Sequence, residues 1–271
     1  MNTAQPLRPW QVPMPKEHGA WVMLATALAV GLLETPTGER GASSWLAAAA
    51  LAAFLAREPA AVALGHRTAR RKAIQGSMAG LQALVLAGLA ALAGTWALLP
   101  LRTDTLIVLA LLTAPGVVAA AAVVRGKEHT VLAELAAAVA LALAGLLVQL
   151  CAPSQDLHSA WPPYLAWGCA FVALTLGVHL AKRRLLRIWP PVQVALANLV
   201  LELAIFAGFV ASQAAGAGLT AVRTAVLAPW LVAVAGPLAC ALARRPKDMQ
   251  AVGLAASALH FVALLAAYAL S

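Results

Sequence analysis

Histidine and glutamate side chains that could transfer protons recur in short, similar motifs along the chain. Lys16-Glu17-His18 is followed 111 positions later by Lys127-Glu128-His129. Histidine suits general acid–base chemistry because its unperturbed pKa lies near about 6.5. We therefore take the histidines next to charged motifs, with the glutamates of these two motifs, as candidate catalytic residues: His18, His66, His129, His179, Glu17 and Glu128.

A second pattern places two arginines a fixed distance after a histidine. His66-x-x-x-Arg70-Arg71 is matched by His179-x-x-x-Arg183-Arg184, with a shift of 113 positions. Two basic helix ends of this kind can grip a phosphate or diphosphate through charge-assisted hydrogen bonds. Charged residues within apolar segments are costly in lipid and are functional candidates too. The candidate ligand-binding residues are therefore Lys16, Arg57, Glu58, Arg70, Arg71, Lys127, Glu134, Arg183, Arg184 and Glu202.

Two other interpretations of the same residues stay open. The arginines can be topology determinants whose side chains reach lipid headgroups, with the histidines simply lying at the membrane interface. Alternatively, nitrogen and oxygen ligands suit zinc, iron or copper, and the four candidate histidines with Glu17 or Glu128 would supply them. Because no HExxH motif and no close histidine pair occurs, we assign no residue as a metal ligand, and the sequence leaves the cofactor unknown.

The composition of the chain limits which elements can position these side chains. Of its 271 residues 62% are hydrophobic and only 11% are charged, whereas soluble domains are roughly 45–50% apolar and about 25% charged. So little charge excludes a soluble or disordered protein. The net charge of +9 does not indicate nucleic-acid binding, because the basic residues alternate with long apolar stretches. We therefore expect membrane lipids as partners.

Apolar segments long enough to cross a bilayer recur along the whole chain. A membrane-spanning helix needs about 20 apolar residues. The predicted spans are 19–34, 43–64, 78–99, 104–124, 131–150, 160–181, 192–212, 222–243 and 249–270. The prediction is an all-α polytopic membrane bundle of about nine helices in one domain, 1–271. No cleavable signal peptide is expected, since four prolines fall in the first fifteen residues.

The basic residues predict the orientation in the membrane. With the N-terminus and the segments after the second, fourth, sixth and eighth spans on one side, sixteen Lys and Arg residues lie there. Only Arg40, Arg102 and Arg223 lie on the other side. We expect a bacterial inner-membrane protein with a cytoplasmic N-terminus and an external C-terminus.

The spacing of the motifs also predicts an internal repeat. Besides the two patterns above, Ala114-Pro115 in the fourth span is matched by Ala228-Pro229 in the eighth, 114 positions later. Two parallel four-helix units, about 16–124 and 127–243, would be followed by one extra helix at about 247–271. Parallel repeats often share a binding site at their interface.

Two resemblances follow from these residues. Pro15-Lys16-Glu17-His18-Gly19-Ala20-Trp21, with Arg57-Glu58-Pro59 after it, resembles the YwiC-like family of bacterial membrane proteins. The nine-helix layout resembles the UbiA superfamily of intramembrane prenyltransferases, whose aspartate-rich motifs hold magnesium at the ends of the second and sixth helices. In those places this chain has His66–Arg71 and His179–Arg184 and no aspartate. The resemblance therefore implies shared architecture rather than the usual prenyl transfer.

The leading functional hypothesis is a cavity, open to the cytoplasm, that binds an amphiphilic lipid or isoprenoid-like molecule with an anionic head. The head would meet the paired arginines, and the histidines would transfer protons. One alternative is a transporter or proton-coupled permease whose polar route uses Glu58, Glu134, Glu202 and His260. Another alternative is a noncatalytic subunit of a membrane complex. Whether the protein is an enzyme stays open.

Overall fold

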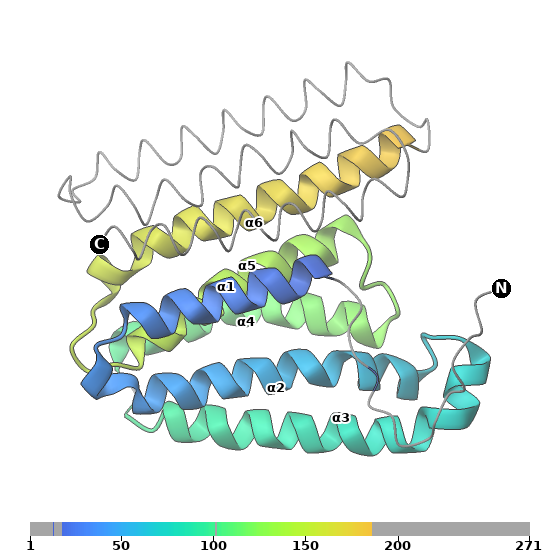
Figure 1. Cartoon of the computed structure of the whole chain (residues 1–271), viewed down its shortest axis with the longest axis horizontal. Helices are drawn as coiled ribbons and strands as arrows, with labels where there is room; N and C mark the ends of the chain where they lie inside the picture. The colour runs from blue at the N-terminus through green and yellow to red at the C-terminus, as the bar shows by residue number, and fades with distance from the viewer. Residues whose placement is uncertain (1–12, 14–17, 101, 186–271) are drawn as a thin grey trace.

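The computed structural model describes residues 13, 18–100 and 102–185, which form helices connected by short turns (Figure 1). No strand occurs within these ranges. In chain order the elements are α1 His18–Glu34, the 3₁₀ turn η1 Thr37–Glu39, α2 Arg40–Leu64, α3 Ala69–Ala97, α4 Thr103–Val124, α5 Val131–Leu150 and α6 Leu157–Leu185.

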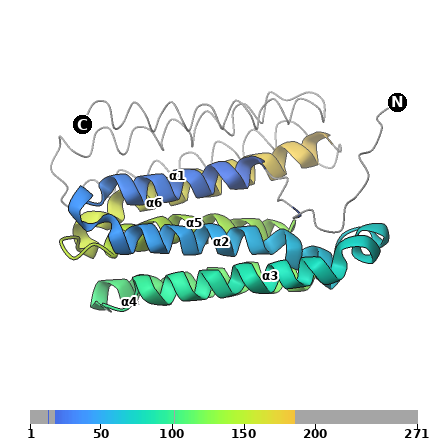
Figure 2. The same cartoon turned by 60° about the horizontal axis from the view of Figure 1, so that its bottom comes forward.

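The six helices lie side by side with their axes along the long dimension of the molecule, and successive helices run in opposite directions (Figures 1 and 2). Helix α5 packs against α1, α2, α4 and α6, while α3 packs against α2. As a result, the turn between α2 and α3 and the turn between α4 and α5 lie at the same end of the bundle. We call this end, with residues 57–72 and 124–134, the basic end.

Small residues allow α1 and α5 to approach closely. A Cβ atom added at Gly145 would lie 2.5 Å from the carbonyl oxygen of Ala27, and one added at Gly31 would lie 2.7 Å from the carbonyl oxygen of Gly145. Glycine and alanine favour such close packing between helices in membranes, where no hydrophobic effect drives helices together. The α1–α5 contact therefore depends on the absence of a side chain at Gly31 and Gly145.

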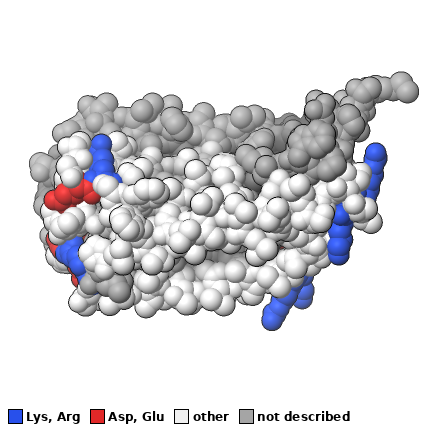
Figure 3. Space-filling view, turned by 90° about the horizontal axis from the view of Figure 1, so that it is seen from below, with Lys and Arg blue, Asp and Glu red and all other residues white. Residues whose placement is uncertain are grey.

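The apolar surface of the bundle fits a membrane environment. Four helical segments are long and apolar enough to cross a bilayer, namely Thr37–Leu64, Ala69–Ala97, Thr103–Val124 and Val131–Leu150. Figure 3 shows an uncharged middle band on the face in view, with charged side chains at both ends. Because this pattern matches the polarity of a bilayer, the chain is an integral membrane protein.

Six of the nine predicted spans fall within the described residues, and each coincides with a helix. Helix α3 differs most, since it begins at Ala69 and not at residue 78. The hydroxyl of Thr68 accepts a hydrogen bond from the Arg71 amide at 3.3 Å and so starts the helix before its apolar section. The last three predicted spans and about half of the second predicted repeat lie outside the described residues.

Candidate functional site

Two similar turns at the basic end position the charged side chains. Gly65 after α2 and Gly126 after α4 have φ angles of 85° and 64°, the left-handed region that glycine adopts readily. At each turn the next residue also donates its amide back into the helix, from His66 to Ala61 and from Lys127 to Ala122. This is the Schellman arrangement, which satisfies the last carbonyls of a helix. Both turns therefore leave their helices in the same way.

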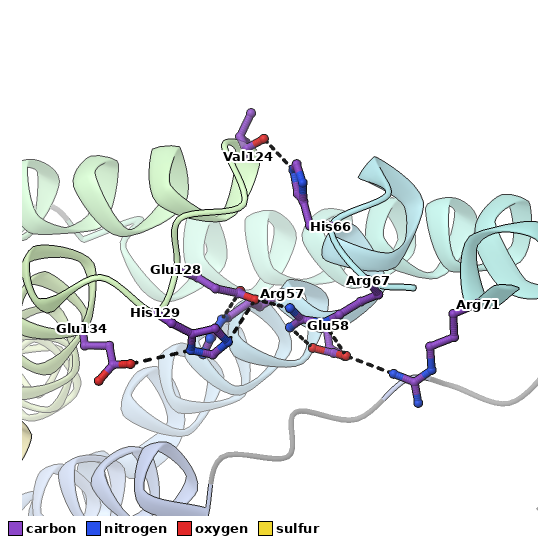
Figure 4. Close-up of polar contacts among 9 residues, drawn as sticks. All are labelled: Arg57, Glu58, His66, Arg67, Arg71, Val124, Glu128, His129 and Glu134. Atoms are coloured by element: carbon purple, nitrogen blue, oxygen red, sulfur yellow. Dashed lines mark hydrogen bonds and ion pairs between the residues drawn. The ribbon is translucent and has the colours of Figure 1, made fainter. Parts of the chain in front are cut away.

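Arg67 and Glu128 follow these glycines by two residues and face each other (Figure 4). Arg67 donates from Nη1 to Glu128 Oε1. It also donates from Nε to Glu58 Oε1 at 3.0 Å and from Nη2 to Glu58 Oε2 at 2.5 Å. The last two bonds form the bidentate fork that fits arginine to a carboxylate. A single guanidinium thus joins α2, the α2–α3 turn and the α4–α5 turn.

Two further arginines complete this cluster. Arg57 donates from Nε to Glu128 Oε2 at 3.2 Å, and Arg71 donates from Nη1 to Glu58 Oε1 at 3.3 Å. The carboxylates are nearly inaccessible, with 7% of the Glu58 side chain and 4% of the Glu128 side chain exposed. Because a buried charge needs a paired partner, these five residues form one unit, which we call the arginine–glutamate cluster.

The cluster shifts the protonation equilibria of its loop residues. Burial alone would raise the pKa of Glu128, but the hydrogen bond from Arg67 and the charge of Arg57 outweigh it, so the pKa of Glu128 is lowered. The hydrogen bond to Glu58 is the largest cause of the raised pKa of Arg67. Both groups are therefore charged at neutral pH, as the ion pairs require.

A second group of polar contacts continues from Glu128 toward α6. His129 has its Nε2 atom 3.6 Å from Glu128 Oε1 and its Nδ1 atom 3.6 Å from Glu134 Oε1. The other oxygen of Glu134 lies 2.9 Å from His179 Nε2. Carboxylates and imidazoles alternate along this path, and we call His129, Glu134 and His179 the histidine path.

His66 has a different contact. Its Nε2 atom lies 2.7 Å from the carbonyl oxygen of Val124 at the end of α4 (Figure 4). A Cβ atom added at Gly126 would lie 2.8 Å from His66 Nδ1, so the ring rests against this glycine. A histidine that binds the last carbonyls of a helix stabilises the helix end. The described contacts of His66 are thus those of a helix cap.

The structure brings together some of the predicted site residues and separates others. Arg57, Glu58, Arg71 and Glu128 meet in the cluster, and His129, Glu134 and His179 meet in the path. Arg70 and Lys127 are exposed at the surface. Four predicted residues lie outside the described residues: Lys16, Glu17, Glu202 and His260. For three others only the helical backbone is described: His18, Arg183 and Arg184.

The two His-x-x-x-Arg-Arg motifs do not have equivalent positions. The first begins in a turn, because Gly65 ends α2 before His66. The second lies wholly within α6, which extends to Leu185. Val178 precedes His179 where Gly65 precedes His66, so the second motif lacks the residue that ends the helix. The prediction that both motifs mark helix ends at matching positions is therefore wrong for this pair.

Comparison with known proteins gives one match. The family model of the YwiC-like proteins matches residues 14–149, about half of the chain. The chain belongs to the YwiC-like family. The matched region contains the whole arginine–glutamate cluster and the first two residues of the histidine path, and it ends before α6. No curated protein and no solved structure matches this YwiC-like chain.

The described residues of this YwiC-like chain do not fit a magnesium site of the UbiA type. Glu58 and Glu128 both accept hydrogen bonds from arginines, which occupy the oxygens that would ligate the metal. Within residues 13, 18–100 and 102–185, no group of three or more His, Cys, Asp or Glu side chains could hold a metal ion. We derive no reaction step through a metal.

The lowered pKa of Glu128 predicts how stability depends on pH. The group stabilises the fold above the ordinary glutamate pKa of about 4.3, and this contribution is lost as the pH falls through its lower folded value. The raised pKa of Arg67 adds no change across the acid range, because arginine is charged there in both states. The midpoint of thermal unfolding should stay constant from pH 7 to about pH 5 and then fall.

The same measurement on Glu128→Gln provides the control. This variant has a similar shape but no ionisable group, so its loss of stability below about pH 4.3 should be smaller than that of the wild type. Parallel acid profiles for the two proteins would contradict a stabilising ionised Glu128.

Proposed function

We propose that this integral membrane protein binds an amphiphilic molecule with an anionic head at the basic end of the bundle. The apolar tail would lie along the helices. The head would be a phosphate or diphosphate of a lipid or isoprenoid-like molecule. On this proposal the basic end faces the cytoplasm of a bacterial cell, since basic residues favour that side of the inner membrane.

The observation that carries the proposal is the excess of positive charge at this end after the buried acids have been paired. Seven basic residues lie there, namely Arg57, Arg67, Arg70, Arg71, Lys72, Arg125 and Lys127. The described acidic residues there are Glu58, Glu128 and Glu134. Figure 3 shows Lys and Arg side chains at both ends of the face in view, but Asp and Glu side chains only at the end opposite the basic end. An anionic head is attracted by such an excess.

The paired residues indicate which arginines would meet the head. Arg67 uses three of its nitrogens on Glu58 and Glu128 and so acts within the cluster. Arg71 is 23% exposed, and its ion pair with Glu58 uses Nη1. Arg70 is exposed on the same turn of α3. We therefore assign head binding to Arg70 and Arg71, with Arg57 and Arg67 holding the site in shape.

Removing these two charges should weaken binding. One basic side chain near an anionic surface contributes about 1 kcal/mol, so Arg70→Gln with Arg71→Gln should reduce the amount of bound anionic lipid by about 10- to 30-fold. Native mass spectrometry of the full chain, purified in gentle detergent and titrated with phosphatidic acid, measures this amount.

A matched control removes one charge from the opposite end. Arg40 donates from Nε to the carbonyl oxygen of Thr35 at 3.0 Å, far from the basic end along α2. Arg40→Gln should leave binding unchanged. If the double variant retained wild-type binding while remaining folded, the proposed head site would be wrong.

One observation favours a second function. The contact between Glu134 and His179 joins α5 to α6 through two ionisable groups, and a proton-coupled permease requires such groups within the membrane protein. Against this, Glu58 and Glu134 lie at the same end and not along a route across the bilayer. A solute flux in proteoliposomes that stops in Glu134→Gln would favour the permease.

A further inference from the structure

The polar contacts at the basic end form a continuous line of groups that can pass a proton. Glu128 Oε1 faces His129 Nε2, His129 Nδ1 faces Glu134 Oε1, and Glu134 Oε2 faces His179 Nε2, at 3.6, 3.6 and 2.9 Å. His129 therefore contacts one carboxylate with each of its two ring nitrogens, and Glu134 contacts one imidazole with each of its two oxygens. We infer that His129, Glu134 and His179 form a proton relay from water to helix α6.

The exposure of the side chains gives the relay a direction. The exposed fraction falls from 59% for His129 to 27% for Glu134 and 14% for His179. His129 lies in the α4–α5 turn at the surface, while His179 lies within α6. Protons therefore enter from water at His129 and reach His179, which is screened from water by the bundle.

The surroundings of the two carboxylates explain why Glu134 is the carrier. Glu128 accepts hydrogen bonds from Arg57 and Arg67, which hold it in its charged form. It can stabilise a positive charge on His129 but is a poor proton acceptor. Glu134, by contrast, contacts two imidazoles, those of His129 and His179. A carboxylate between two imidazoles can take a proton from one and give it to the other.

The transfer conserves protons and charge. His129 takes a proton from water on Nε2 and becomes a cation. It releases the proton on Nδ1 to Glu134 Oε1, which leaves His129 neutral and the carboxyl group neutral. Rotation of that carboxyl group presents the proton to His179 Nε2. The final state has a charged His179, an ionised Glu134 and a neutral His129 with its proton on Nε2. His129 must change tautomer or turn its ring before it accepts the next proton.

The relay rests on the proposed function in one respect: the proposed ligand would be the molecule that accepts the proton from His179. His179 on α6 lies across the bundle from Arg70 and Arg71 on α3, so a protonated His179 would be a donor to a part of the bound amphiphile other than the head held by those arginines. The geometry of the relay does not depend on that ligand. The two proposals can therefore fail separately.

Replacing Glu134 with glutamine tests the relay. Glutamine has nearly the same shape and can hydrogen-bond to both histidines, but it cannot carry a proton between them. Nitrogen-15 NMR of full-length protein in nanodiscs, labelled at its six histidines, measures how fast the His179 ring proton exchanges with water. In Glu134→Gln this exchange should slow by at least about tenfold. This is a conservative figure, because a positioned acid–base group typically contributes more than that to the rate of a proton transfer.

Two further variants make the result decisive. His129→Gln removes the entrance at an exposed position and should slow the exchange as well. His158→Gln changes another exposed histidine outside the path, at the start of α6, and should have no effect. An unchanged exchange rate at His179 in either folded variant, His129→Gln or Glu134→Gln, would overturn the relay. Slow exchange together with unaltered lipid binding in the Arg70/Arg71 variant would retain the relay and reject the head site.

Discussion

Replacing Arg67 with alanine is expected to lower the free energy of unfolding by about 3–5 kcal/mol, the usual cost of breaking a buried ion pair from one side. The reason is that Glu58 and Glu128 both depend on this guanidinium and are less than one tenth exposed. Without Arg67, two carboxylates would stay buried with fewer partners. Thermal unfolding of the full chain in detergent, followed by circular dichroism, measures the change.

The neighbouring arginine supplies the control. Arg70 is exposed, three residues farther along the chain, and Arg70→Ala should change stability by no more than about 0.5 kcal/mol. Arg67→Lys should restore only part of the loss, because an ammonium group cannot donate a fork to Glu58 while also reaching Glu128. Equal stabilities of Arg67→Ala and Arg70→Ala would show that the cluster does not hold the bundle end together.

Replacing Gly145 with valine is expected to cost about 3 kcal/mol, the upper range for overpacking a tight contact. The first added carbon would already lie 2.5 Å from the Ala27 carbonyl oxygen and 2.8 Å from Cε1 of Tyr164. Because a backbone carbonyl cannot turn aside as a flexible side chain can, α1 must move away from α5. Urea or thermal unfolding of the purified variant would report the loss.

Gly88 in α3 offers a matched substitution in open space. A Cβ atom added there has no neighbour within 4 Å, so Gly88→Val should change stability by no more than about 0.5 kcal/mol. A loss at Gly88 as large as that at Gly145 would mean that helix propensity, and not the α1–α5 contact, sets the cost.

The helices could largely be predicted from the sequence, because in lipid the apolar length of a segment nearly determines its structure. Each predicted span within the described residues matches a helix. The start of α3 was harder, since Arg70, Arg71 and Lys72 mark the end of the apolar stretch but not the end of the helix. Hydropathy detects the membrane-embedded part of a helix, whereas the cap at Thr68 depends on a hydrogen bond.

The site could be predicted only in part. Glu58, Glu128 and Glu134 stood out because acids within or beside apolar segments are rare. Arg67 belongs to no motif, and the prediction missed it. A signal did exist, because Arg67 and Glu128 each come two residues after a glycine that ends a helix. Two equivalent turns with opposite charges at the same position favour a contact between them.

The sequence did not show which of the arginines and histidines pair within the protein, and the reason is physical. Arg57 and Arg71 were predicted to bind a ligand, and the structure adds that each donates to a buried carboxylate. His66 was taken as a candidate for proton transfer, but its ring meets a helix carbonyl. The spacing of residues along the chain indicates which types of residue lie at one end of a bundle. It does not indicate which of those residues form ion pairs or hydrogen bonds with each other.

Photocrosslinking tests most directly whether the basic end binds the anionic head of an amphiphile. A long-chain phosphate amphiphile with a diazirine next to its phosphate would be incorporated into nanodiscs holding the full chain. Peptide mapping would follow illumination. We predict label concentrated in residues 66–72 and 125–129. Label concentrated at the opposite end, around residues 35–40 and 151–156, or spread equally over both ends, would contradict the proposed site.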